Sequence, residues 1–232
     1  MRHGGSTCSS PRGPSARAWA ARIGLDDGRL RDGRSSVEGL SAAALPGFPS
    51  PRLTFADRLR GDKAPDVLIE ILALIDAPPP AYLVGDGPLR GPLTRLIRAR
   101  GLEAVVHLPG WSYEPARDIA QATVHVVPSR EESWSQSAVL ALGLGVPVVG
   151  TAIDGLVCTL AAGRGVLVPP EDPHALARAL SAVLGGERPD PAPGRAYARQ
   201  FTPSAAAAAY ARAYRQLLAR RAQTGQASTP PP

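Results

Sequence analysis

Short apolar runs in this sequence alternate with longer stretches in which apolar residues recur every three or four positions. The run at Val124, Val126 and Val127, ended by Pro128, is typical of a buried strand, whereas 65–76 has the spacing of an amphipathic helix. The expected strands are Leu53–Ala56, Ala81–Gly85, Val105–Leu108, 124–127, a strand beginning at Val146, and Gly163–Pro170. The expected helices are 65–76, 89–100, 114–121, one from Ser133 to the Gly143/Gly145 pair, 173–184 and 203–222. This alternation predicts an α/β fold with a doubly wound, Rossmann-like parallel sheet.

The start of the fourth expected helix carries a pattern that favours an anion. Ser133 and Gln136 have the S-x-x-Q spacing of a capping box, which predicts that the helix begins at Ser133. The amides of Trp134, Ser135 and Gln136 would then be unpaired at a helix N-terminus, which suits a diphosphate. Glu132, directly before the cap, would suit hydroxyl groups on whatever carries that anion.

Polar and glycine-rich segments follow three of the predicted strands. Arg58 and Lys63 come after the first strand, Gly85-Asp86-Gly87 after the second, and Glu132-Ser133-Trp134 after the fourth. Ligands of doubly wound sheets bind at the carboxyl ends of the strands, so these segments predict a phosphate-bearing ligand. No G-x-G-x-x-G follows the first strand and no Walker A motif is present, which argues against NAD and against an ATPase.

The chain divides by composition into four parts. Residues 1–50 are rich in Gly, Ser, Arg and Pro and are expected to be mostly irregular. Residues 51–202 hold the alternating strands and helices. An Ala-rich helix at 203–222 follows, and 223–232 is expected to be a disordered tail.

Charge and cysteine content exclude several classes of protein. The net charge is +6, but the arginines are scattered and three Phe are present, which argues against nucleic-acid binding. No apolar run reaches the length of a transmembrane segment, and the N-terminus has no signal-peptide pattern. Cys8 and Cys158 lie far apart in the sequence and show no metal-ligand spacing, so we expect no metal site. We expect both to be free thiols in a reducing compartment, which implies a cytoplasmic location. His107 and His125 fall in predicted buried strands and are expected to pack in the core.

Three motifs resemble a known family. PSREESWS at 128–135 and GVPVVGT at 145–151 resemble the donor-site signature of the family 4 retaining glycosyltransferases, which have the GT-B fold. Arg58, Leu59 and Lys63 match that family's G-R-L-x-x-x-K-G motif, with Asp57 and Ala64 in place of its glycines. YLVGDGPLR at 82–90 is close to the family's L-V-G-D-G-P-x-R. The resemblance covers about 51–222, which implies a single GT-B half-domain that binds the donor.

The resemblance implies transfer of a sugar from a UDP-, GDP- or ADP-sugar with retained configuration and with neither metal nor cofactor. It assigns the donor diphosphate to Arg58, Lys63, Ser133, Trp134 and Ser135, and the sugar hydroxyls to Glu132. The nucleotide-side loops would be those of Gly85, Asp86, Gly87 and Trp111, although a tryptophan at this position more often packs in the core, and Asp86 equally fits a plain turn between strand and helix. No residue can be assigned as catalytic, because the family supplies the acceptor side from its other domain.

Departures from the family pattern leave alternatives open. The family's second glutamate, which accepts the ribose hydroxyls, is Leu140 here, and Asp154 is a candidate to replace it. The segment at Asp154 is either a helix start or a loop near the sugar. No acceptor domain has a counterpart in 1–50, which favours a vestigial or partner-dependent nucleotide-sugar binding protein as the alternative to an active enzyme, with an acceptor-domain chain as a possible partner. A GT-B-type epimerase would need acid and base residues that the sequence does not offer.

Overall fold

The computed structural model describes residues 21–23, 35–41 and 51–223. Its centre is a parallel sheet of six strands in the described part of the chain, in the order β3-β2-β1-β4-β5-β6. The strands are β1 (Leu53–Ala56), β2 (Ala81–Val84), β3 (Val106–Gly110), β4 (Val124–Val127), β5 (Val148–Thr151) and β6 (Val166–Val168). The predicted doubly wound α/β fold is therefore confirmed.

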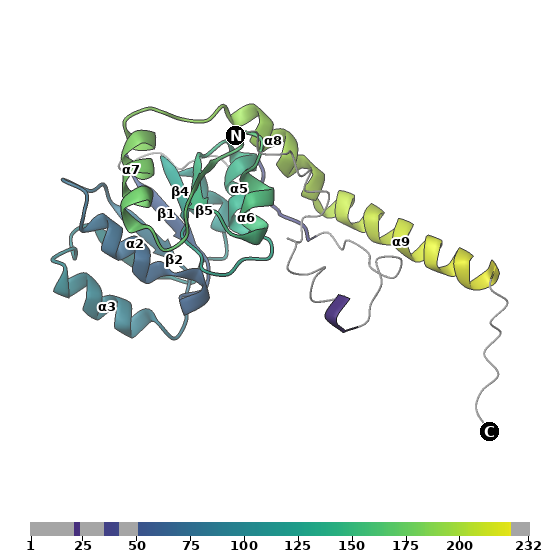
Figure 1. Cartoon of the computed structure of the whole chain (residues 1–232), viewed down its shortest axis with the longest axis horizontal. Helices are drawn as coiled ribbons and strands as arrows, with labels where there is room; N and C mark the ends of the chain where they lie inside the picture. The colour runs from purple at the N-terminus through teal and green to yellow at the C-terminus, as the bar shows by residue number, and fades with distance from the viewer. Residues whose placement is uncertain (1–20, 24–34, 42–50, 224–232) are drawn as a thin grey trace, which may run out of the picture.

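Helices cover both faces of the sheet (Figure 1). They are α2 (Pro65–Leu72), α3 (Arg90–Ala99), α4 (Pro115–Ala120), α5 (Gln136–Leu144), α6 (Asp154–Leu160), α7 (Pro173–Leu184), α8 (Pro191–Ala198) and α9 (Pro203–Gln223), with 3-10 turns η1 (Gly61–Lys63) and η2 (Arg199–Phe201). Strands between two helical layers are buried on both sides, which explains why β4 is apolar along its length apart from His125.

Two apolar clusters, one on each face, hold the layers together. On one face Leu68, Leu93 and Leu180, from α2, α3 and α7, pack against the strands. On the other face α4, α5, α6 and α8 contribute side chains such as Ile119 and Leu156. Burial of apolar side chains at about 25 cal/mol per Å² is the main force that fixes these helices on the sheet.

The strand order reverses between β1 and β4. From β1 the chain moves outward to β2 and β3, then returns to β4 on the other side of β1 and continues to β5 and β6. At such a reversal the loops after the two central strands turn to opposite faces and leave a crevice at their carboxyl ends. The loops that carry Lys63 and Glu132 follow these two strands.

Several predicted boundaries differ from the structure. Helix α2 ends at Leu72, four residues earlier than predicted, because a turn follows in which Ala77 has the left-handed φ of 49° before Pro78. Helix α8 was not predicted. The segment at Asp154 is a helix, and α7 has the predicted bounds with Asp172 as its cap, accepting a hydrogen bond from the Ala175 amide at 2.8 Å.

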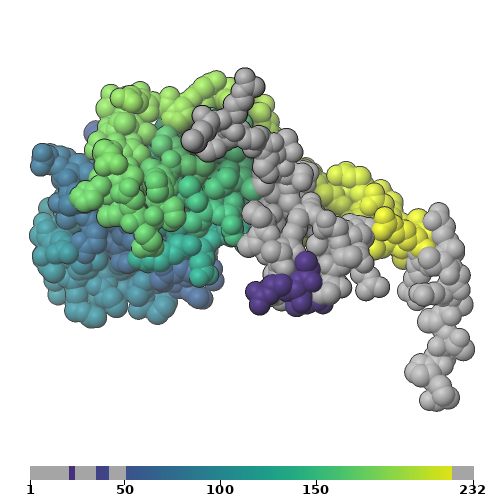
Figure 2. Space-filling view, viewed as in Figure 1, coloured from purple at the N-terminus to yellow at the C-terminus, as the bar shows by residue number. Residues whose placement is uncertain are grey.

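Helix α9 projects away from the body of the molecule (Figure 2). Its apolar side chains Tyr210, Tyr214, Leu217 and Leu218 are exposed.

The two cysteines were expected to be free thiols. Cys158 is disulfide-bonded, so that expectation is wrong for this residue. Cys8 lies outside the described residues, as do most of 1–50 and all of 224–232, for which the predictions of irregular structure and a disordered tail were made.

Candidate functional site

A cleft of about 1360 Å³ lies at the carboxyl ends of β1, β2 and β4. Its wall comes from five separate parts of the chain, so it forms only when the sheet is assembled. They are residues 35–39, the loop after β1 with Arg58 and Lys63, the end of β2, residues 111–117 before and within α4, and the segment from Glu131 to Leu140. Six acidic and three basic side chains line it among the described residues.

Lys63 lies at the centre of the charged part of this cleft. Its Nζ lies 2.5 Å from Oε2 of Glu132 and 3.5 Å from Oδ2 of Asp57. The Lys63 and Glu132 side chains are only 8% and 5% exposed. Two residues predicted to bind different parts of a ligand are thus in direct contact with each other.

Backbone hydrogen bonds hold the loops after β1 and β4 in place. The amides of Arg130 and Glu131 both donate to the carbonyl of Asp62. From the other side, the Gly155 amide at the start of α6 donates to the carbonyl of Glu132. A side chain at Gly155 would collide with the Ser133 carbonyl at 2.4 Å, so the glycine allows this close approach. The position of Glu132 is therefore fixed by its backbone as well as by Lys63.

Arg58 also lines the cleft but is far less buried than Lys63, since its side chain is more than half exposed. Its guanidinium lies 3.9 Å from carboxylate oxygens of both Asp57 and Asp62. Exposed ion pairs at such distances contribute little to stability, so the side chain can reorient toward a ligand.

Helix α5 starts two residues later than its capping pattern predicted. The N-cap of α5 is Ser135, not Ser133, and its Oγ accepts a hydrogen bond from the Ala138 amide at 3.2 Å. The Trp134 amide, predicted to be unpaired, donates to Oε1 of Glu132 at 3.2 Å. Ser133 and Trp134 line the cleft, whereas Ser135 does not.

The unpaired amides at this terminus are those of the next two residues. Gln136 and Ser137 are the first residues of α5 and line the cleft, and neither amide has a backbone or side-chain partner in the described structure. The positive end of the α5 dipole therefore points at the cleft from these two positions. The capping signal at Ser135, with Ala138 as N3 residue, carries no Glu or Gln and was missed for that reason.

The Gly85-Asp86-Gly87 turn contacts its neighbouring loop. Only Gly85 of the three is among the residues that line the cleft. A Cβ on Gly85 would lie 1.9 Å from the Asp57 carbonyl, and one on Gly87 would lie 2.6 Å from the Leu59 carbonyl. Both glycines have positive φ, and the Asp86 carbonyl accepts from the Leu59 amide. In the structure the glycines thus let the backbone approach the loop that carries Arg58.

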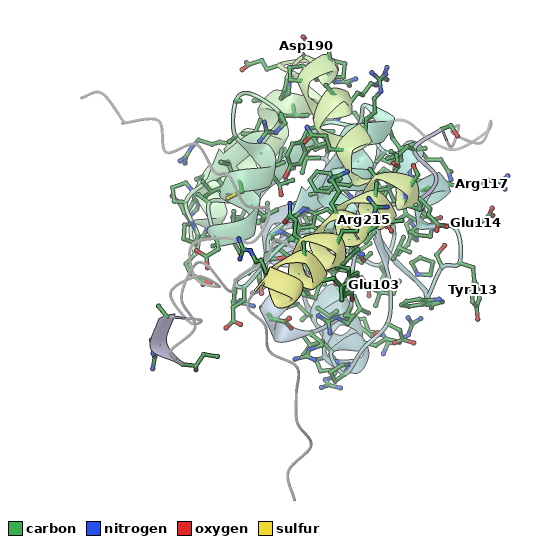
Figure 3. The ribbon with its side chains drawn as sticks, turned by 90° about the vertical axis from the view of Figure 1, so that its right-hand side faces the viewer. Glu103, Tyr113, Glu114, Arg117, Asp190 and Arg215 are labelled. Atoms are coloured by element: carbon green, nitrogen blue, oxygen red, sulfur yellow. The ribbon has the colours of Figure 1, made fainter. Side chains whose placement is uncertain are left out.

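The rim of the cleft opposite this loop is aromatic and polar. Trp111 is 67% exposed, so the alternative that it packs in the core is wrong, and Tyr113 beside it is almost fully exposed. Glu114 and Arg117 form an ion pair at 3.2 Å. Tyr113, Glu114 and Arg117 project from the same edge of the molecule in Figure 3.

His107, expected in the core, is half-buried and stacks against Tyr82, whereas His125 is fully buried.

Leu140 faces both the cleft and the apolar core. It is 6% exposed, belongs to the cluster that contains Val37 and Ile119, and still lines the cleft one turn into α5 from Gln136. Asp154, the residue considered as a replacement for the missing glutamate, does not line the cleft.

No group of three or more His, Cys, Asp or Glu in the described ranges is arranged to hold a metal ion. No helix within them combines the length and the apolar character that crossing a membrane requires.

Comparison with known proteins identifies the family. The sequence pattern of the family described as glycosyl transferases group 1 matches residues 50–185. A D-inositol 3-phosphate glycosyltransferase of Xylanimonas cellulosilytica is 38% identical over 187 residues, which are 74% of this chain and 44% of that protein. The protein of the same name from Streptomyces avermitilis is 35% identical over 194 residues, 76% of this chain and 41% of that protein.

Solved structures share the fold. Sucrose-phosphate synthase from Thermosynechococcus elongatus superposes with a TM-score of 0.77 at 26% identity, over 90% of this chain and 58% of that one. Anabaena Alr3699/HepE, solved in complex with UDP-glucose, gives a TM-score of 0.75 at 18% identity, over 90% and 62% of the two chains. The fold is thus the Rossmann-like half of a GT-B glycosyltransferase.

This chain spans less than half the length of the D-inositol 3-phosphate glycosyltransferases that it matches. The family pattern nevertheless covers more than half of the chain, and relatives above 30% identity align with about three quarters of it, so the chain belongs to the group 1 glycosyl transferases.

Proposed function

We propose that this chain is the C-terminal, donor-binding domain of a family 4 retaining glycosyltransferase and that its cleft binds a nucleoside diphosphate sugar. The observation that carries the proposal is the meeting of Lys63, Arg58, Glu132 and the start of α5 in one cleft at the reversal of strand order. Cations and helix-terminal amides at this place suit a diphosphate. The solved complex of Anabaena Alr3699/HepE with UDP-glucose, a protein of the same fold, supports a UDP-sugar as the first ligand to test.

The residues would divide the donor among them. Lys63 and Arg58 bind the diphosphate together with the amides of Gln136 and Ser137, which replace Trp134 and Ser135 as the amides in reach. Glu132 accepts hydrogen bonds from the sugar, and Trp111 lies beside the base. Preorganised donors of this kind stabilise a leaving diphosphate without a metal ion. Ser133 lines the cleft between the two groups, whereas Asp86 and Gly87 support the loop that carries Arg58.

A partner-dependent binding protein is the second candidate function. The side chain of Leu140 lines the cleft but offers no hydrogen-bond acceptor to a ligand. The exposed apolar stripe of α9 suits packing against a further domain. In this case the chain binds the nucleotide sugar, but the sugar is transferred only when an acceptor domain is also present, supplied by a longer protein or by a partner chain.

Calorimetry with UDP, GDP and ADP tests the ligand class. We expect heat of binding with at least one of them, weakened in Lys63→Ala by about 1.5–3 kcal/mol, as is typical of a charge-assisted hydrogen bond. Arg100→Ala, which removes an exposed cation paired with Glu70 outside the cleft, is the control and should bind normally. A folded sample that binds none of the three nucleotides would overturn the proposal.

A turnover assay separates the two candidates. The chain by itself should release free sugar from the donor slowly or not at all, and should not glycosylate simple acceptors. Rapid transfer by the purified chain alone would show that the acceptor side is already present and would contradict the partner-dependent reading.

A further inference from the structure

Asp57 contacts two of the three basic side chains that line the cleft, Lys63 and Arg58. Its Oδ2 lies 3.5 Å from Lys63 Nζ, and its Oδ1 lies 3.9 Å from Arg58 Nε and accepts a hydrogen bond from the Arg58 amide at 2.7 Å. The residue directly follows β1 and lines the cleft itself. Its backbone is fixed as well, since its amide donates to the Val84 carbonyl and its carbonyl lies against Gly85. The carboxylate is therefore held where an anion would have to approach Lys63 and Arg58.

Lys63 faces two carboxylates in the ligand-free cleft. Glu132 alone balances its charge, at 2.5 Å, so the second carboxylate leaves the local group with a net negative charge before Arg58 is counted. Arg58 is in turn shared between Asp57 and Asp62. An incoming diphosphate meets cations that are already occupied, and its binding is weakened by repulsion from Asp57.

This repulsion grows with the charge of the ligand. The terminal phosphate of a free nucleoside diphosphate loses a second proton near neutral pH. In a nucleotide sugar the diphosphate is esterified at both ends and lacks that ionisation, so the donor carries one negative charge fewer than the product that remains after sugar transfer. A fixed carboxylate beside the diphosphate site must therefore disfavour the product more than the donor.

We infer that Asp57 is a specificity-determining residue, which rests on the proposed function: it weakens binding of the free nucleoside diphosphate more than binding of the nucleotide sugar. The consequence for a glycosyltransferase is that the spent nucleotide leaves readily and competes poorly with fresh donor.

Calorimetry with UDP, UDP-glucose and inorganic pyrophosphate tests this role in Asp57→Asn. Asparagine keeps an oxygen for the Arg58 amide and removes the charge, and Asp57→Ser provides a second neutral variant if the first is poorly folded. We expect affinity for UDP to rise by on the order of tenfold and for UDP-glucose by roughly threefold or less, as one added charge at partly screened distance predicts. Pyrophosphate should behave as UDP does.

The matched control is Glu70→Gln. It removes one carboxylate from an exposed arginine pair that does not line the cleft, and it should change none of the three affinities. Raising the salt concentration supplies a further control, because the advantage of Asp57→Asn for UDP should shrink with ionic strength if it is electrostatic.

The outcomes separate this inference from the proposed function. If UDP-glucose binds and Asp57→Asn changes both ligands equally or not at all, the role of Asp57 is wrong and the proposed function stands. If pyrophosphate binds more tightly to Asp57→Asn but UDP-glucose binds to neither protein, the anion site is right and the nucleotide-sugar function is wrong. If none of the three ligands binds to either protein, both are overturned.

Discussion

The buried ammonium of Lys63 and the buried carboxylate of Glu132 are in direct contact at 2.5 Å, although 69 residues separate them in the sequence. This ion pair connects the loop after β1 with the loop after β4 across the reversal of strand order. Under the proposed function, the pair places a cation for the diphosphate beside an acceptor for the sugar hydroxyls, so a ligand that spans the two would have to rearrange the pair as it binds.

Removing one partner of this pair should cost more stability than removing both. Lys63→Met leaves the Glu132 carboxylate buried with the Trp134 amide as its remaining polar contact, and such changes cost about 3–5 kcal/mol. In the double variant Lys63→Met/Glu132→Gln no unpaired charge is left, so its loss should be smaller than that of Lys63→Met alone. Urea unfolding of the wild type, both single variants and the double variant measures this. Additive losses would contradict a coupled pair.

Leu140 should limit recognition of the ribose. A ribose diol that faces leucine loses a hydrogen-bond partner, at a cost of roughly 1–3 kcal/mol. We expect the wild type to bind UDP and its deoxyribose analogue with similar affinity, and Leu140→Glu to gain affinity for the ribonucleotide alone. Its melting temperature should fall, because the new carboxylate lies partly among the apolar neighbours of Leu140.

Asp154→Ala is the matched test of the alternative ribose partner. Since Asp154 does not line the cleft, this variant should leave the ratio of the two affinities unchanged. Loss of ribose discrimination in Asp154→Ala, together with no gain in Leu140→Glu, would show that the ribose binds elsewhere than we propose.

His125 should make the protein less stable in mild acid. It is fully buried in β4 beside the Thr54 hydroxyl, and burial lowers its pKa from the usual 6.5 to about 3. Between these values the unfolded chain binds a proton that the folded chain does not, so stability is lost as pH falls below 6.5. The expected loss from this residue is about 2 kcal/mol between pH 8 and pH 5.

Denaturant titrations at both pH values measure that loss. His125→Asn cannot titrate in this range, so the difference in unfolding free energy between pH 8 and pH 5 should be smaller in this variant, whatever its stability at pH 8. An equal difference in wild type and variant would show that other groups cause the acid sensitivity.

Trp111 should contribute to binding of the base and not of the phosphates. Stacking of a base on an aromatic side chain contributes about 1–3 kcal/mol, so Trp111→Ala should weaken UDP by that amount and leave pyrophosphate unchanged. Tyr214→Ala, which removes an exposed aromatic ring from α9, serves as the control. Equal weakening of UDP and pyrophosphate by Trp111→Ala would point to a disturbed loop rather than to lost stacking.

The sequence by itself determined the elements and the chemistry of the loops that follow them. The spacing of apolar residues predicted the bounds of β1 and α7 correctly. A helix buried along one stripe and a strand buried on both faces each leave their own pattern of apolar residues in the sequence. The same reading placed Arg58, Lys63 and Glu132 directly after strands, and all three line the cleft.

The tertiary structure decided which of these loops meet. A parallel strand has the same apolar pattern beside any neighbour, so the sequence did not reveal that β1 and β4 are adjacent and that the strand order reverses between them. That adjacency alone brings Lys63 to Glu132. Residues 35–39, which carry no strand or helix signal, join the wall of the cleft because Val37 packs into the cluster beside α4 and α5.

Long-range contacts also overruled one local signal and supplied the partner of another. The S-x-x-Q pattern predicted a cap at Ser133. In the structure the carbonyl of Glu132 accepts a hydrogen bond from the Gly155 amide, and its side chain accepts one from the Trp134 amide. The helix therefore begins only after Ser135. The segment Gly85-Asp86-Gly87 was assigned to the nucleotide side from its place after a strand, and in the structure its two glycines let the backbone approach the loop after β1. A local pattern specifies a conformation, whereas its partner depends on residues that only folding brings near.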